Sequence, residues 1–217
     1  MRLITLFSVL AFGCVAHGVT GHTLLGLAEI PRVIAAEESG KLTSNSFVRL
    51  YASPTYGSQV SAVAKHVNDF DHREFSFERD GAAVYAQSGK WLYVGLAGGE
   101  GGWLAPDDVG AFHSLADLLK NDVYMTSDWD GNYWKDPEAR PQDPSVFAHR
   151  GTERINYIKA DVNVLDHKMI KDKLWFKVEI LGPGRCTERK PAKLETGWIP
   201  AENSEHKLNF WFSTRGC

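Results

Sequence analysis

The chain has 217 residues, a length that suits one medium domain or two small ones. Its hydrophobic fraction of 43% and charged fraction of 24% are those of an ordinary globular protein, and they exclude a largely disordered chain. The formal charge of -3 gives no basic surface of the kind that nucleic acid requires, so we expect no DNA or RNA partner.

The N-terminus has the layout of a secretory signal peptide. Arg2 precedes an apolar stretch over residues 3–15, and small residues then allow cleavage after Ala16 or Gly18. We therefore assign residues 1–18 to a signal peptide and expect a periplasmic or secreted protein.

Two other interpretations of this segment stay open. No Asp, Glu, Lys or Arg occurs in residues 3–28, which is long enough to span a bilayer without cleavage, but four glycines and two histidines interrupt it. Cys14 suggests a lipoprotein site, but Phe12 stands where such a site needs a small residue. Contact with a membrane is expected only if the segment is retained.

The cysteines agree with export. Removal of the signal peptide takes away Cys14 and leaves Cys186 and Cys217, an even pair that in an exported chain most simply forms a disulfide. Closing this loop would stabilise the fold by roughly 3–4 kcal/mol. Metal ligation by the two thiols lacks both a CxxC spacing and a nearby histidine.

From Phe47 onward the sequence breaks into short alternating apolar runs separated by turn residues. This pattern predicts a small β-barrel or sandwich over residues 45–110. Residues 19–44 are interpreted as a lead-in linker with some helical character that Pro31 interrupts. The strands expected in the first block are 47–51, 60–63, 75–77, 83–85, 91–96 and 102–106.

A connector is expected over residues 111–152. Its apolar residues over 112–119 repeat at three- and four-residue spacing, which predicts a short helix. Asp130-Gly131 then predicts a hairpin turn. A second strand-rich block covers residues 153–217, with strands expected at 160–164, 175–181 and 197–201.

The two blocks resemble each other. In both, a tryptophan-led strand is followed by glycine, tryptophan and an aliphatic residue: Trp91-Leu92-Tyr93-Val94 with Gly102-Trp103-Leu104, and Trp175-Phe176-Lys177-Val178 with Gly197-Trp198-Ile199. This pattern resembles the signature of bacterial SH3-like (SH3b) domains. Residues 160–164 are similar to the opening strand of that family, with Leu165 in place of its usual arginine. The resemblance implies a mainly β fold of two divergent SH3-like barrels joined by a helix and hairpin, and it leaves the function open.

Alternation along the tryptophan-led strands separates aliphatic from aromatic side chains. If the aliphatic row fills each barrel, Trp91, Tyr93, Trp103, Trp175 and Trp198 lie on the outside, where exposed rings can bind peptides or glycans. The alternative is that these rings pack beneath a loop or against the neighbouring module, because tryptophan is usually well buried.

Asp128 and Asp130 invite a catalytic or calcium-binding interpretation. A calcium loop of the EF-hand type needs glycine at its sixth position and glutamate at its twelfth, where this chain has Tyr133 and Ala139. Asp-Gly at a hairpin turn explains the same residues.

The densest group of metal-ligating residue types is His66, Asp69, Asp71, His72 and Glu74. Their spacing matches no known metal motif, so we expect a charged, solvated loop with no metal and no cofactor.

Nucleophilic catalysis lacks support, since there is no G-x-S-x-G elbow and no thiol is left unpaired after export. We therefore expect a non-catalytic binding or scaffolding protein of the bacterial cell envelope, not an enzyme. The family resemblance suggests peptidoglycan or an envelope protein as its partner. An envelope hydrolase that uses Asp128 and Asp130, or a hydrolase accessory, with the barrels as targeting modules, is the alternative. A structural role, in which the barrels pack together and recruit another protein, is a third possibility.

Overall fold

The computed structural model describes residues 23–41, 43, 46–120, 123–129, 133–138, 161–171, 173–182 and 191–212. The expected signal peptide, the expected Asp130-Gly131 turn and the cysteines Cys14, Cys186 and Cys217 lie outside the described residues. The prediction of a disulfide therefore stays a prediction.

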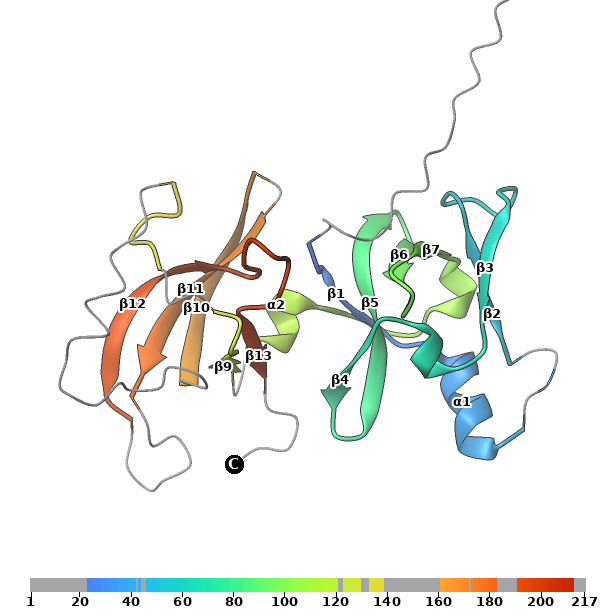
Figure 1. The fold of residues 1–217 in the computed structure, drawn as a ribbon, viewed down its shortest axis with the longest axis horizontal. Helices are drawn as coiled ribbons and strands as arrows, with labels where there is room; N and C mark the ends of the chain where they lie inside the picture. The colour runs from blue at the N-terminus through green and yellow to red at the C-terminus, as the bar shows by residue number, and fades with distance from the viewer. Residues whose placement is uncertain are drawn as a thin grey trace, which may run out of the picture.

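The described chain is mainly β and forms two antiparallel sheets that lie side by side (Figure 1). The first sheet has the order β3-β2-β7-β6-β5-β1-β8, with β4 paired to β5, and the second has the order β12-β11-β10-β9-β13. No strand pairing among the described residues closes either sheet into a barrel. The strands of the first sheet are β1 (Gly26–Ala28), β2 (Val48–Tyr51), β3 (Val60–Ala64), β4 (His72–Ser76), β5 (Arg79–Ser88), β6 (Trp91–Gly95), β7 (Gly101–Leu104) and β8 (Phe112–Ser114). Those of the second are β9 (Val123–Met125), β10 (Asp161–Ile170), β11 (Lys173–Leu181), β12 (Lys193–Pro200) and β13 (Phe210–Phe212).

Part of the segment interpreted as a lead-in linker, β1, belongs to the first sheet. β1 lies between β5 and β8, with Leu27 opposite Ala83 and His113 and fully buried. The first sheet therefore extends beyond residues 45–110 at both ends. The strand escaped prediction because three residues are too few to show alternation.

Helix α1 (Pro31–Ser39) begins at the proline that was expected to interrupt it. Proline suits the first helical position, where its missing N–H would have no intrahelical partner. The helix ends at Gly40, whose left-handed φ of 62° allows its N–H to bond to the Glu37 carbonyl at 3.1 Å. Among the described residues, no helix has the length and apolar character needed to cross a membrane.

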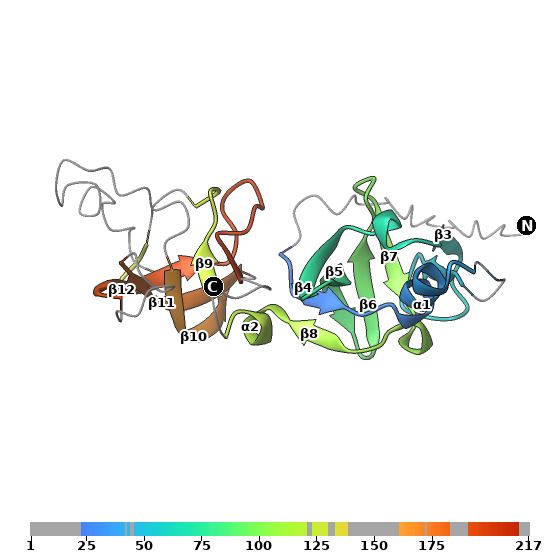
Figure 2. The same ribbon diagram turned by 90° about the horizontal axis from the view of Figure 1, so that it is seen from below.

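The helix expected over 112–119 is only partly formed. Its first residues make β8, and a single turn, α2 (Leu115–Leu118), follows. The Ser114 side chain accepts the Asp117 N–H at 3.1 Å and caps this turn. Leu115 and Leu119 are fully buried, which accounts for their helical spacing. Figure 2 shows that β8, α2 and β9 lead from one sheet to the other.

The two tryptophan-led segments occupy equivalent places. β6 lies between β5 and β7, and β11 lies between β10 and β12. Tyr93 is opposite Trp103 in the first sheet, and Lys177 is opposite Trp198 in the second. The similarity between the two sequence blocks therefore reflects the same pair of strands, hydrogen-bonded in the same register, in each sheet.

The repeat extends to five strands. β1 and β9 each lie between a long strand and a short C-terminal one, so the order β7-β6-β5-β1-β8 recurs as β12-β11-β10-β9-β13. Ala28 is opposite Ala82 in the first copy, as Val123 is opposite Val162 in the second. The long strands β5 and β10 each change register against the next strand, β6 or β11, and they do so at the equivalent position. This change indicates a β-bulge in each long strand. We call these two five-stranded units the first copy and the second copy.

A glycine precedes the second tryptophan of each copy because a neighbouring segment packs directly against it. A Cβ on Gly102 would lie 2.7 Å from the Cβ of Leu50 in β2. A Cβ on Gly197 would lie 2.3 Å from the Tyr133 ring and 3.0 Å from the Trp134 carbonyl oxygen. The glycines therefore allow β2 and residues 133–134 to take equivalent places beside β7 and β12.

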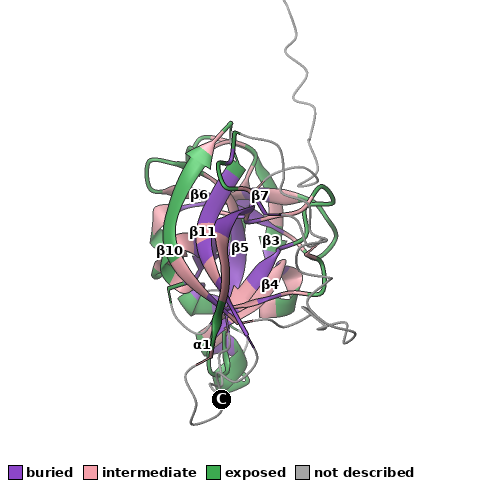
Figure 3. Ribbon diagram, turned by 90° about the vertical axis from the view of Figure 1, so that its left-hand side faces the viewer, coloured by how far each residue is buried: buried purple, intermediate pink, exposed green. Residues whose placement is uncertain are grey.

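One buried cluster joins the two copies. A smaller cluster lies within the first sheet, but the larger one combines Leu27 and Phe75 of the first sheet with Phe176, Ile199 and Phe210 of the second. The first half therefore has the smaller cluster to itself and shares the larger one with the second half. Figure 3 shows the buried residues along β5 and β11 and the exposed residues along much of β10.

A polar contact reinforces this junction. The backbone N–H of Leu24 donates to Oε1 of Glu202, which belongs to the chain between β12 and β13, at 2.7 Å. The Glu202 side chain is 8% exposed, and Nδ1 of His206 lies 3.5 Å from its other oxygen. Burial raises the pKa of the Glu202 carboxyl, while the Leu24 N–H and His206 act in the opposite direction.

We predict that Gly197→Ala destabilises the protein by about 1–3 kcal/mol, because the added methyl group collides with the buried Tyr133 ring. The free energy of unfolding from urea titration measures the effect. Gly98→Ala is the matched control, since nothing lies within 4 Å of its Cβ position. Equal stability of the two variants would contradict the close packing of residues 133–134 against Gly197 of β12.

We predict that Glu202→Gln is at least as stable as the wild type at about pH 8 and loses this advantage by about pH 4. The folded-state pKa of Glu202 is raised above the ordinary value of 4.5, so the ionised carboxylate lowers stability at high pH and this penalty disappears on protonation.

Glu202→Ala should cost about 1–3 kcal/mol of unfolding free energy, because it leaves the Leu24 N–H without its acceptor. Unfolding titrations across this pH range measure both effects; an advantage of Gln that grows on acidification would refute the direction of the shift.

Candidate functional site

The outer face of the first sheet over β2, β7 and β6 is the candidate site. Leu50, Leu104 and Leu92 lie opposite one another across these three strands, and all three are buried. Because successive side chains point to opposite faces, the next row lies on the outside. That row consists of Tyr51, Trp103 and Tyr93.

The sequence-predicted residues Trp91, Tyr93 and Trp103 of the first copy all lie on this outer face and are half-buried. Trp91 shares the face with Tyr93 because the two residues alternate with the buried Leu92 and Val94 along β6.

Edge-to-face contacts hold the rings in place. The Trp91 ring centroid lies 5.5 Å from that of Tyr51, with an interplanar angle of 87°, and 4.9 Å from that of Tyr56, at 63°. Tyr93 and Trp103 make a similar contact at 5.5 Å and 68°. This geometry is the one that aromatic rings prefer, and it fixes their orientation before any ligand arrives. We call these five residues the aromatic face.

Tyr56 is the outermost ring, with 57% of its surface exposed. Its hydroxyl donates to Oδ2 of Asp107 at 2.9 Å. This hydrogen bond is the main reason that the pKa of Tyr56 is raised, so the phenol stays protonated and remains a donor at neutral pH.

A charged pocket of about 240 Å³ adjoins the aromatic face. Nη1 of Arg32, from α1, lies 2.6 Å from Oδ1 of Asp108, in the 3₁₀ helix η2 (Pro106–Asp108). Burial raises the pKa of Asp108, and the neighbouring guanidinium opposes that effect. The pocket is lined by Arg32, Phe47, Arg49, Tyr51, Tyr56, Ala105, Asp107 and Asp108.

The second copy does not expose an equivalent face. Trp175 and Trp198, which were expected on the outside, are each only 9% exposed. Trp134 takes the place of Tyr51 beside the Gly-Trp strand, and its ring contacts Trp175 at 5.1 Å and 89°. Nζ of Lys168 lies 4.5 Å from the centre of the Trp198 ring. The alternative interpretation, in which a neighbouring segment covers the rings, therefore holds for this copy.

Sequence reasoning missed Tyr51, Tyr56 and Arg49. Tyr51 and Arg49 alternate with the buried Leu50 in a strand that was predicted, so their outward orientation could have been predicted as well. The position of Tyr56 beside Trp91 depends on the path of a loop, for which the sequence has no signal.

The expected loop of metal-ligating residue types is divided among separate structural roles. The Asp69 carboxylate accepts the backbone N–H groups of Lys65 and His66 at 2.7 and 3.0 Å. Asp71 accepts a hydrogen bond from the Tyr85 hydroxyl. Within the described part of the chain, no three His, Cys, Asp or Glu side chains gather as metal ligands would.

A recess of about 450 Å³ lies beside Tyr85, the bulged residue of β5. Burial, together with the hydrogen bond to Asp71, raises the pKa of Tyr85 well above its usual range, so this phenol stays protonated. A Cβ on Gly95 would lie 2.9 Å from the Tyr85 ring, so the ring is closely packed. Its hydroxyl already has a partner within the fold, Asp71.

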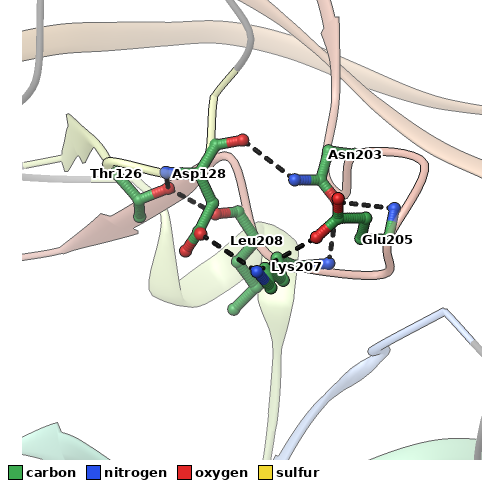
Figure 4. Close-up of polar contacts among 6 residues, drawn as sticks. All are labelled: Thr126, Asp128, Asn203, Glu205, Lys207 and Leu208. Atoms are coloured by element: carbon green, nitrogen blue, oxygen red, sulfur yellow. Dashed lines mark hydrogen bonds and ion pairs between the residues drawn. The ribbon is translucent and has the colours of Figure 1, made fainter.

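Asp128 anchors one loop to another (Figure 4). Its carbonyl oxygen accepts a hydrogen bond from Nδ2 of Asn203 at 2.9 Å, and its N–H lies 3.3 Å from Oγ1 of Thr126. Nζ of Lys207 lies 3.8 Å from its carboxylate and 3.0 Å from that of Glu205. These contacts account for the conformation of Asp128, and Asp130 lies outside the described residues.

Comparison of the chain with protein-family models, with curated proteins and with solved structures gave no match. The aromatic face and the charged pocket beside it are therefore the features from which a function can be inferred.

Proposed function

We propose that this protein is an exported, non-catalytic binding protein of the bacterial cell envelope, and that its aromatic face binds peptidoglycan. One observation supports this most directly: neighbouring strands and a loop place five rings on one surface, with contacts that fix their orientation. Such a surface, with polar groups at its edge, suits a ligand that has both apolar faces and hydrogen-bonding groups. A polymer of sugars cross-linked by peptides has this character.

The proposal treats the two copies as divergent SH3-like modules. The shared order of five antiparallel strands and the repeated Gly-Trp strand support that assignment. Location in the periplasm or outside the cell is supported by the apolar N-terminal sequence and by the even pair of cysteines that remains after its removal.

The copies have different roles in this proposal. The first copy binds, because its rings are accessible, while Trp175 and Trp198 of the second are covered by Trp134 and Lys168. The second copy supports the first through the shared buried cluster.

We predict that the mature protein cosediments with purified cell wall and that Trp91→Ala or Tyr56→Ala weakens binding about tenfold or more, as expected for aromatic anchors. Phe77→Ala is the matched control, because Phe77 is an aromatic residue with the same 57% exposure as Tyr56 and lies outside the aromatic face.

Two outcomes would count against the proposal. If the wild type stays in the supernatant, it does not bind cell wall. If the wild type sediments and both variants sediment equally well, the wall contacts another surface.

A further inference from the structure

The charged pocket has an unusual balance of groups. Two arginines and two aspartates are among its lining residues, so their formal charges sum to zero. Its volume of about 240 Å³ is below the usual size of drug-like ligand sites. A pocket of this size suits one amino-acid unit or one end of a larger ligand.

Of the two arginines that line the pocket, Arg49 is the one left to bind a ligand. It lies on the outward side of β2, next but one to Tyr51, and its side chain is exposed. Its guanidinium lies 5.7 Å from the centre of the Phe47 ring, and in the described part of the chain it makes no ion pair. Arg32 differs, because Asp108 already holds it at 2.6 Å.

Of the two aspartates that line the pocket, Asp107 is the one left to bind a ligand. Tyr56 donates a hydrogen bond to Oδ2 of Asp107, but a neutral phenol leaves the negative charge of the carboxylate in place. No Lys, Arg or His of the described residues forms an ion pair with Asp107. Within the described residues, Arg49 and Asp107 are thus opposite charges that form no ion pair, and they line one pocket with the rings of Tyr51 and Tyr56. The charge of Arg49 also acts on Asp108, where it opposes the rise in pKa that burial causes.

We propose that this pocket binds a zwitterionic group, an amine and a carboxylate on one short unit, with Arg49 taking the carboxylate and Asp107 the ammonium. Charged hydrogen bonds of this kind are the strong ones, and a guanidinium matches a carboxylate through two parallel bonds. A ligand with only one of the two charges would leave the opposite charge of the pocket unpaired.

This inference rests on the proposed function and names the part of the wall that is recognised. The peptide of the wall polymer supplies such a unit where it contains a diamino acid whose side chain ends in both an amine and a carboxylate. The sugars would lie along the aromatic face while that side chain enters the pocket.

The test uses the full mature chain and three peptides: L-Ala-γ-D-Glu-meso-diaminopimelate, the same peptide with its side-chain carboxylate amidated, and the same peptide with its side-chain amine acetylated. We expect the first to bind about tenfold or more tightly than either blocked form, as measured by calorimetry or tryptophan fluorescence. Equal binding of the three peptides, or no binding of any, would overturn the inference.

Substitutions assign each charge to its half of the ligand. Arg49→Gln should remove the preference for the free over the amidated carboxylate, and Asp107→Asn the preference for the free over the acetylated amine. Both residues are exposed, so folding should be unaffected. Arg79→Gln and Asp117→Asn make the same chemical changes at exposed residues elsewhere and should change neither preference.

The two proposals fail in distinguishable ways. If wild-type protein cosediments with cell wall but Arg49→Gln keeps the full preference for the free carboxylate, the pocket assignment is wrong and wall binding stands. If the wild type does not cosediment, the proposed function and this inference are both wrong.

Discussion

The buried row of Leu50, Leu104 and Leu92 is the constraint on which the candidate site depends. These side chains meet across three strands and must face the core to leave water. Alternation then commits the neighbouring row, which includes Tyr51 and Trp103, to the opposite side of the sheet. A slip of one residue in any of these strands would exchange the two rows, so burial of the aliphatic row fixes the register and the aromatic face together.

The repeat shows how one strand pattern can serve two purposes. Inside, Phe176 and Ile199 of the second copy take the places of the leucines of β6 and β7. Outside, Lys177 stands where the first copy has Tyr93, and Trp134 covers the tryptophans of the second copy. The second copy therefore has an aromatic outer face that the chain itself occupies, whereas the first copy leaves its face to solvent. The shared buried cluster makes the two copies one structural unit.

The strands could be predicted from the sequence where apolar and polar residues alternate over four positions or more. The strands around Leu50, Leu92 and Phe176 were predicted close to their observed bounds, and the internal repeat was visible in the Gly-Trp pairs. The short strand at Leu27 was missed because three residues are too few to show alternation and because its partners β5 and β8 lie far along the chain. The burial of Trp175 was not predictable either, since it depends on the pairing of Trp134 with Trp198 beside β12. The sign of this contact in the sequence is a single glycine, Gly197.

The central claim is that the outer face of the first copy, and not that of the second, is the binding surface. The most direct test is to follow the indole N–H signals of the seven tryptophans by NMR while soluble peptidoglycan fragments are added. We expect the signals of Trp91 and Trp103 to shift in proportion to occupancy and those of Trp175 and Trp198 to stay in place. Shifts confined to Trp175 and Trp198, or no shift of any indole signal at saturating fragment, would contradict this account.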